Sequence, residues 1–424
     1  MIDLRSKAWK KAAGALAVST GLCAGLGLLA VHQAAADPGT ATAYAGVGSD
    51  TTQDVMDALA GQSPWAGAGS TSAPKFFTPI LSSAATSSKQ IVSWDAIPFG
   101  GSATAPGCIT PKYGAPAMDR PNGSSAGINA LNAAINGTGW VNSVSTTCTV
   151  SSVTIGAANL DFARSSRGPN NTTTSNLTFV PFARDAVMYV YESNGPDDLH
   201  NLTTAQLASV YTTANTTIGA TTVAVCLPQA GSGTRSFWEG AIGVADNLAT
   251  TAANANSCNA LEEHGGNSFH TAAQAYLAGG ANRAMVFPFS VSQFVAQGNG
   301  FGVDRSATFR ASAAAQYGDP DNISGGVGPF SGTAGTYAGN ASFYNFNSGA
   351  TVGTYGRDVY NVFKTSKLGS ALAGGDAGIQ SLFNTGTNAN ATGLCVSASA
   401  RTIVHNFGFR DPAACGSTVL TGNS

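Results

Sequence analysis

Charge is what this chain lacks most. Only 10% of its 424 residues are Asp, Glu, Lys or Arg, and the formal net charge at pH 7 is −2. A protein that binds nucleic acid needs a basic surface, so this composition argues against that class of function. Glycine, serine, threonine and asparagine are abundant instead, and their hydroxyl and amide groups suit a neutral, soluble extracellular surface.

A long apolar run is missing after residue 36, which argues against a membrane-spanning helix in the rest of the chain. Residues 1–36 are typical of a cleaved signal peptide, since four basic residues precede an apolar run and Ala34–Ala36 fits the small-residue cleavage rule. A membrane anchor is the alternative, which the Gly and Ala content of the run disfavours. Cleavage removes four of the 20 basic and one of the 22 acidic residues, leaving a net charge of −5.

No Cys-x-x-C pair or zinc-type Cys/His spacing occurs, so we expect neither a metal nor a cofactor. Six cysteines remain after the signal, and an even number in an exported chain predicts disulfides. Several connectivities are open. The simplest joins neighbours along the sequence: Cys108–Cys148, Cys226–Cys258 and Cys395–Cys415.

Short apolar segments alternate with helical patterns, which predicts an α/β fold with mixed sheets and flanking helices. The length after cleavage suits two lobes rather than one core. The predicted strands are residues 41–47, 89–94, 152–155, 186–191, 222–227 and 283–288. The predicted helices are residues 51–59, 125–135, 204–211, 233–242, 269–278 and 359–366.

Three glycine- and serine-rich turns each precede a predicted helix: Gly48–Thr52, Gly123–Gly127 and Gly231–Arg235. A helix start has unpaired N–H groups and a partial positive charge, and glycine allows a ligand to approach the backbone closely. A single such turn is explained by helix capping alone. Three that converge would form a pocket for a small oxyanion.

Two other motifs suggest different chemistry. The second turn matches G-x-S-x-G with Ser125 as nucleophile, although the residues before it do not read as the strand that a hydrolase requires. Glu262, Glu263, His264 and His270 have the side chains of metal ligands. Their spacing differs from H-E-x-x-H and glycines follow, so we expect a solvated loop.

With these turns in place, the chain resembles the phosphate-type substrate-binding proteins of ABC importers. The first turn follows a predicted strand, and Asp161–Pro169 is similar to the family's DFGASD segment. An apolar strand and a Leu-Thr-x-x-x-Leu helix at Leu202–Leu207 precede Gly231–Arg235. The resemblance implies a two-lobed periplasmic-binding-protein-like fold of type II with a ligand cleft between the lobes. One lobe would hold residues 37–184 and 284–424, with a Gly/Asn-rich insertion at residues 319–356, and the other residues 185–283.

The resemblance also implies a phosphate site, with two departures. Ser166 replaces an acceptor Asp, and Pro228 stands where the family has an Arg. Asp50 could replace the acceptor, and Arg164, Arg167 or Arg235 the cation. If Asp50 lines the pocket, hydrogen phosphate is favoured over sulfate. The expected ligand contacts are Asp50, Thr51, Ser124, Ser125, Arg164, Ser165, Ser166, Ser232, Gly233, Thr234 and Arg235.

We therefore expect a secreted, non-enzymatic and monomeric solute-binding protein that binds phosphate or a similar anion, with an ABC permease as a possible partner. Two alternatives stay open. One is a secreted serine hydrolase that uses Ser125. The other is an extracellular adhesion or matrix module that keeps a ligand-free binding-protein scaffold.

Overall fold

A computed structural model describes most of the chain after residue 43. The described residues are 44–61, 91–98, 107–141, 153–174, 176–245, 258–345, 353–370, 374–383, 385 and 393–423. The expected signal peptide and Cys148 lie outside them. None of the described helices has the length and apolar character needed to cross a membrane.

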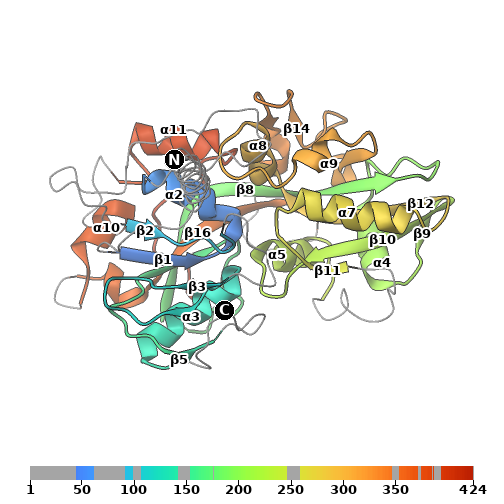
Figure 1. The fold of residues 1–424 in the computed structure, drawn as a ribbon. Coiled ribbons are helices and arrows are strands. Elements are labelled where there is room, and N and C mark those ends of the chain that lie inside the picture. The colour runs from blue at the N-terminus through green and yellow to red at the C-terminus, as the bar shows by residue number, and fades with distance from the viewer. Residues whose placement is uncertain are drawn as a thin grey trace, which may run out of the picture. The chain divides into compact units, whose positions relative to one another are not determined.

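One mixed sheet organises the described residues (Figure 1). The main path of the sheet runs in the order β11-β10-β12-β8-β16-β7-β1-β2. The bounds of these strands are Cys258–Leu261, Thr221–Pro228, Arg283–Ser290, Leu177–Ser193, Gly356–Lys364, Phe162–Ser165, Tyr44–Gly48 and Ile91–Ser93. Three short strands pair beside this path: β9 (Thr217–Ile218), β13 (Ala315–Gly318) and β17 (Thr421–Gly422).

The long strand β8 is shared by both halves of the sheet. Its first part, from Leu177 to Ala186, pairs with β16, and its second part, from Val187, pairs with β12. Nearly every residue of β8 is buried, which fits a strand covered on both faces. The expected lobe boundary at residues 184 and 185 falls near this change of partner, and the boundary stays a prediction.

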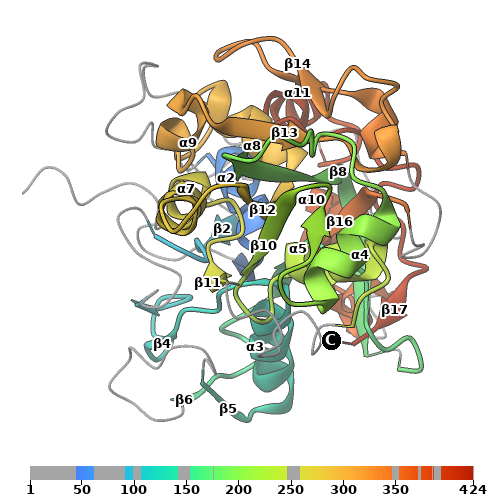
Figure 2. The ribbon, with the colours of Figure 1, turned by 90° about the vertical axis from the view of Figure 1, so that its right-hand side faces the viewer.

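Helices cover both faces of the sheet, which confirms the α/β prediction (Figure 2). Around β1, β7 and β16, one core contains side chains of α2, α10 and α11, and another contains those of α3. Around β10 and β12, one core contains α4 and α5, and another contains α7, α8 and α9. The bounds are α2 Gln53–Leu59, α3 Ser124–Asn136, α4 Thr204–Thr212, α5 Gly233–Ala241, α7 Gly266–Leu277, α8 Val291–Gly298, α9 Ala307–Ala311, α10 Ala377–Phe383 and α11 Ala398–Asn406.

The α-helix predicted at residues 359–366 is wrong, because residues 359–364 belong to strand β16 and the next two residues begin a short 3-10 helix, Thr365–Leu368. Val359, Tyr360, Val362 and Phe363 are β-branched or aromatic, and all are buried between β7 and β8. Asn361 interrupts the apolar residues, so these four fall at i, i+1, i+3 and i+4, a helical spacing that the buried strand imitates.

The predicted insertion at residues 319–356 contains a short hairpin. Strands β14 (Phe330–Ser331) and β15 (Ala338–Gly339) pair antiparallel. The Phe330 ring stacks on Phe294 of α8 with 4.6 Å between ring centroids, and Tyr337 lies 5.4 Å from the same ring. The hairpin is thus packed on the protein through aromatic contacts.

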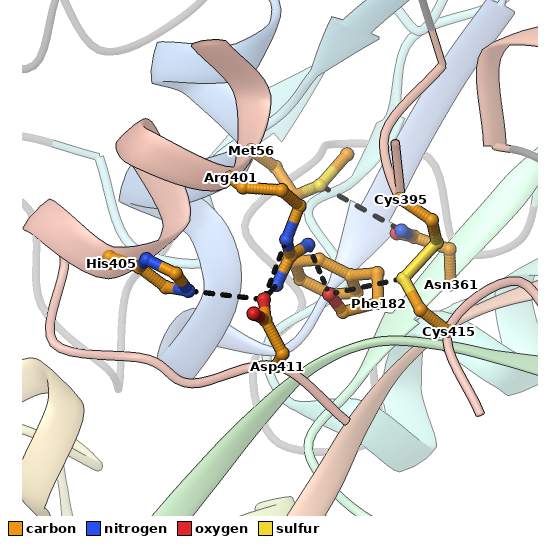
Figure 3. Close-up of a disulfide and its surroundings, with 8 residues drawn as sticks. All are labelled: Met56, Phe182, Asn361, Cys395, Arg401, His405, Asp411 and Cys415. Atoms are coloured by element: carbon orange, nitrogen blue, oxygen red, sulfur yellow. Dashed lines mark hydrogen bonds and ion pairs between the residues drawn. A yellow bond between two sulfur atoms is a disulfide. The ribbon is translucent and has the colours of Figure 1, made fainter. Parts of the chain in front are cut away.

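Two of the expected disulfides are present, Cys226–Cys258 and Cys395–Cys415. The first joins the parallel strands β10 and β11 at directly paired positions. The second lies beside β8, where the Cys415 Sγ is 3.7 Å from the carbonyl oxygen of Phe182 (Figure 3). Cys108 is also disulfide-bonded, but its expected partner Cys148 lies outside the described residues.

Candidate functional site

The three predicted turns meet at one place. The hydroxyl oxygens of Thr51 and Thr234 are 3.1 Å apart, which joins the first turn to the third. The Ser125 N–H donates to the Gly231 carbonyl at 3.1 Å, which joins the second turn to the third. This convergence is the geometry on which the predicted oxyanion site depends.

Glycine is required where the turns touch. A Cβ atom on Gly233 would lie 2.3 Å from both the Ser124 and the Ser166 hydroxyl oxygens. Gly123 has a φ of 95°, and a Cβ there would lie 2.8 Å from the Gly231 carbonyl oxygen. Any side chain at these positions would therefore push the turns apart.

Helix α5 begins at the centre of this convergence. Ser232 is its N-cap and accepts a hydrogen bond from the Arg235 N–H at 3.0 Å. Strand β10 leads into the turn and α5 leads away from it, so the N–H groups of the helix start lie at the place where the turns meet. Six of the predicted site residues around this helix start are almost fully buried: Asp50, Thr51, Ser124, Ser166, Ser232 and Thr234.

The serines after β7 are held by internal hydrogen bonds. The Ser166 N–H donates to the Ser124 hydroxyl at 3.0 Å, and the two hydroxyl oxygens are 3.3 Å apart. Ser165 donates instead to the Arg167 carbonyl at 2.7 Å. Ser124 and Ser166 therefore lie beside Gly233, whereas the Ser165 hydroxyl closes its own local turn.

The three arginines proposed as cations bond to protein oxygens. Arg164 is fully buried, and its guanidinium donates to Ser93 Oγ and to the backbone carbonyls of Gly48, Ser49 and Trp94. The Arg167 guanidinium donates to Ser125 Oγ and the Gly168 carbonyl, and that of Arg235 contacts Glu239 and the Pro228 carbonyl.

Arg357 of strand β16 supplies a cation that sequence reasoning missed. Its Nη2 donates to Thr234 Oγ1 at 2.9 Å and to Asp185 Oδ2 at 2.7 Å. Its Nη1 is buried and has no hydrogen-bond partner. No motif surrounds Arg357, so only the pairing of β16 with β8 brings it to the site. A buried guanidinium with an unused donor is suited to bind an oxyanion.

The expectation of a solvated loop at Glu262–His264 is wrong for Glu263 and His264, which are buried at the site. Glu263 accepts hydrogen bonds from Thr51 Oγ1 at 2.7 Å and from the Thr234 N–H at 3.3 Å. The loop follows β11, which is parallel to β10, so both loops emerge at the same edge of the sheet. The acidic pair Glu262–Glu263 was at most a weak signal, because Asp197 and Asp198 form a second such pair outside the predicted turns.

The pKa values of Glu263 and Asp50 are shifted in opposite directions. Burial would raise the pKa of Glu263, but hydrogen bonds from Asp50, Ser232 and Thr51 and attraction to Arg357 lower it to about 2. Burial and the adjacent Glu263 charge raise the pKa of Asp50 well above its ordinary value. Opposite shifts in two neighbouring buried carboxyl groups favour a single proton on the Asp50 side of the pair.

His264 is neutral, and its position fixes its tautomer. Burial and the nearby Arg305 lower its pKa to about 3. Its Nε2 is 3.4 Å from Arg305 Nη1, which can only donate. The proton of His264 is therefore on Nδ1, 3.6 Å from Asp50 Oδ2. His270 takes no part, since its Nδ1 is 2.6 Å from Glu192 Oε1.

Ser125 lacks the setting of a nucleophile. Its hydroxyl accepts a hydrogen bond from Arg167 Nη2 at 2.8 Å, and a guanidinium cannot take the proton of an attacking serine. The arrangement holds the second turn in place rather than activating the hydroxyl.

Two further features lie outside the converging turns. Within the described residues, Asp54, Asp57 and Asp95 form a buried group whose ligand atoms lie within 4.8 Å of one another. Burial raises the pKa of Asp57, as do the charge and hydrogen bond of Asp95. Protonation of Asp57 and the positive charge of the nearby Arg164 can therefore balance the negative charge of the three carboxyl groups.

A cavity of about 610 Å³ lies between α8, β15 and the segment after α11, away from the three turns.

Comparison with known proteins places the chain among binding proteins. Residues 49–299 match a family described as a PBP superfamily domain. An ABC-type phosphate transport receptor from Vibrio cholerae is 16% identical, with a TM-score of 0.37 over 68% of this chain and 86% of that one. A phosphate binding protein from Stenotrophomonas maltophilia is 13% identical, with a TM-score of 0.39 over 88% of this chain and 92% of that one. No curated protein sequence matches the chain.

Proposed function

The chain belongs to the PBP superfamily, and from this premise we propose that it is an exported solute-binding protein whose ligand is phosphate. The observation that carries the proposal is the convergence of three helix-start turns beside Arg357. The turns offer N–H and hydroxyl donors, and the guanidinium offers a charge with one unused donor. Donors of these kinds in a buried place bind a small oxyanion strongly.

Asp50 favours phosphate over sulfate. Its side chain is fully buried beside Glu263 and caps no helix. Only the ionised form of Asp50 can accept a hydrogen bond from hydrogen phosphate, so we propose that Asp50 gives up its proton when the ligand binds; sulfate has no proton to donate at neutral pH. The contacts that we propose for the ligand are with Thr51, Ser232, Gly233, Thr234 and Arg357, with Ser124 and Ser166 behind Gly233.

The enclosed site implies that the protein opens to admit its ligand. Ser232, Thr51 and Thr234 are each 2% exposed or less. Thr51 precedes α2 and Thr234 lies at the start of α5, so separation of the two proposed lobes would break the contact between them and open the site. We propose that such a hinge movement admits the ligand and that an ABC permease receives it.

Calorimetry with inorganic phosphate at neutral pH tests the proposal. We expect binding by the wild type and a loss of at least about tenfold in affinity for the double variant Ser232→Ala with Thr234→Ala, because two hydroxyl donors are removed. The variant Ser397→Ala removes the N-cap of α11 and controls for the loss of a cap alone. The absence of heat with phosphate, sulfate, molybdate and organophosphates would reject an anion-binding function.

The two alternatives predict different results. A hydrolase that uses Ser125 would turn over esters or phosphoesters and lose this activity in the Ser125→Ala variant. A scaffold without a ligand would show neither turnover nor any rise in melting temperature with small anions, because only a bound ligand stabilises the folded state.

A further inference from the structure

A carboxylate already occupies the centre of the three turns. Glu263 Oε1 accepts the Thr234 N–H at the start of α5, and Glu263 Oε2 accepts the Thr51 hydroxyl. These are the donors that an oxyanion at this place would use, and an ionised carboxylate resembles an oxyanion because it has charge and only accepts.

A polarised chain of hydrogen bonds directs the donors to Glu263. Arg357 Nη2 donates to Thr234 Oγ1 at 2.9 Å, the Thr234 hydroxyl is 3.1 Å from Thr51 Oγ1, and Thr51 donates to Glu263 at 2.7 Å. Because Arg357 can only donate, the chain has one direction and ends on the carboxylate. Both ends of the chain are therefore satisfied without any ligand.

The strand arrangement fixes Glu263 in this place. Strands β10 and β11 run parallel, and the Cys226–Cys258 disulfide joins them. Ser232 follows the end of β10, and Glu263 follows the end of β11 by two residues. Two loops at the same edge of a parallel sheet meet there, so Glu263 is delivered to the start of α5 by its own strand.

We propose that Glu263 is a tethered anion that occupies the oxyanion site of the free protein and that the ligand must displace. This inference rests on the proposed function. The Thr234 N–H and the Thr51 hydroxyl, which Glu263 engages, are not available to a second anion, and a bound phosphate beside the Glu263 carboxylate would be repelled at short range. Movement of the β11–α7 loop releases the carboxylate.

A built-in carboxylate also sets the class of ligand. A free monocarboxylate would make the same hydrogen bonds as Glu263. It would also lose translational freedom on binding, which Glu263 does not, because Glu263 is part of the chain. A doubly charged tetrahedral oxyanion has more acceptor oxygens and can also use Arg357 Nη1 and accept from the α5 N–H groups. The site thus selects hydrogen phosphate and similar dianions against carboxylates.

The test compares Glu263→Gln with the matched control Glu262→Gln by calorimetry with inorganic phosphate and with acetate. Both variants remove one negative charge from the same loop, but the Glu262 carboxylate contacts Arg305. We expect Glu263→Gln to bind phosphate about tenfold more tightly or better, and Glu262→Gln to bind it within about twofold of the wild type. A variant Glu263→Ala, which leaves the place empty, should also gain measurable acetate binding.

The outcomes separate this inference from the proposed function. If the wild type binds phosphate and Glu263→Gln binds it equally or more weakly, Glu263 assists the ligand, and the inference is wrong while the proposed function stands. If no protein in the series binds any anion, both are wrong. A nuclear magnetic resonance titration that gives Glu263 an ordinary carboxyl pKa in the free protein would also reject the inference, because the donors would then not be engaged.

Discussion

At the scale of single residues, the choice of cation decides how the site works. Arg357 and Asp185 form a buried pair between β16 and β8, and the adjacent register position holds the pair Asp358 and Arg184. Successive residues of a strand point to opposite faces of a sheet. The two ion pairs therefore have the same strands and similar chemistry, but only the first reaches Thr234.

Arg357→Lys should lower phosphate affinity by about tenfold or more, because a lysine cannot keep the contacts to Asp185 and Thr234 and also bind a ligand. The matched variant Arg184→Lys should change affinity by less than about twofold. Calorimetry gives both affinities, and melting curves show whether each variant is folded. Equal losses for the two variants would contradict a role of Arg357 in binding.

Sequence reasoning found the hydrogen-bond donors of the site but not its charged groups. Gly48–Thr52, Gly123–Gly127 and Gly231–Arg235 could be predicted because glycine and N-cap residues act locally. Glu263 and Arg357 could not, since each reaches the site only through strand pairing over a long sequence distance. Whether a charged residue is buried depends on tertiary contacts that no local pattern encodes.

At the scale of elements, the starts of α3 and α5 touch through glycine. A Cβ on Gly233 would collide with two hydroxyl groups, whereas Gly137 at the end of α3 has a φ of 64° and no atom within 4 Å of an added Cβ. Substitutions at the two glycines therefore test two different effects: close packing at Gly233 and backbone conformation at Gly137.

Gly233→Ala should lower the free energy of unfolding by about 2 kcal/mol through overpacking and should also weaken phosphate binding. Gly137→Ala should cost about 1 kcal/mol, because only the left-handed conformation is disfavoured, and should leave binding unchanged. Urea unfolding and calorimetry on the same samples measure both effects. Unchanged binding in Gly233→Ala would show that contact between the turns is not needed for the site.

The two described disulfides hold different elements: Cys226–Cys258 joins β10 to β11, whereas Cys395–Cys415 lies beside β8. Replacing both Cys226 and Cys258 with serine should lower the free energy of unfolding by about 3 to 4 kcal/mol, from the constraint on the unfolded chain, and should change anion binding, because β11 carries Glu263. Replacing Cys395 and Cys415 should cost about 3 kcal/mol and leave binding unaltered. Calorimetry of the folded variants decides, and equal effects on binding would contradict the proposed coupling.

At the scale of elements, the sequence predicted the helices and strands that have local signals. Helices α3, α4 and α5 have caps, glycines or an amphipathic pattern, and the predicted ranges agree with the structure within a few residues. Strand β16 was predicted as a helix because its buried run lacks alternation. The strand order of the sheet, and with it the placement of β16 beside β8, depends on long-range pairing that the sequence did not reveal.

At the scale of the whole molecule, buried ionisable groups determine how stability depends on pH. Burial, together with nearby carboxyl groups, raises the pKa values of Asp50 and Asp57 well above their ordinary values. Burial lowers the pKa of His264 to about 3. Above pH about 4 the unfolded chain loses two carboxyl protons that the native protein keeps, and below pH about 6.5 it gains a histidine proton that the native protein lacks.

The signs of these contributions give a net slope. The raised pKa values of Asp50 and Asp57 make stability fall as the pH rises above about 4, whereas the lowered pKa of His264 makes stability rise up to pH about 6.5. With two groups against one, stability should fall between these pH values. Above pH about 6.5 the histidine contribution ends and the fall should steepen. Urea unfolding at several pH values from 5 to 7.5 measures this slope.

The variant Asp57→Asn measures the contribution of Asp57 to this pH dependence of stability. The amide resembles the protonated acid, so the variant should lose about 1.4 kcal/mol per pH unit of the slope and be more stable than the wild type at pH 7.5. Asp411→Asn is the control, because hydrogen bonds from Arg401 lower the pKa of Asp411 despite partial burial, and it is ionised in both states throughout this range. A wild-type stability that rises from pH 5 to 7.5 would mean that Asp50 and Asp57 are ionised in the native protein, and a cation would then have to balance Asp54, Asp57 and Asp95.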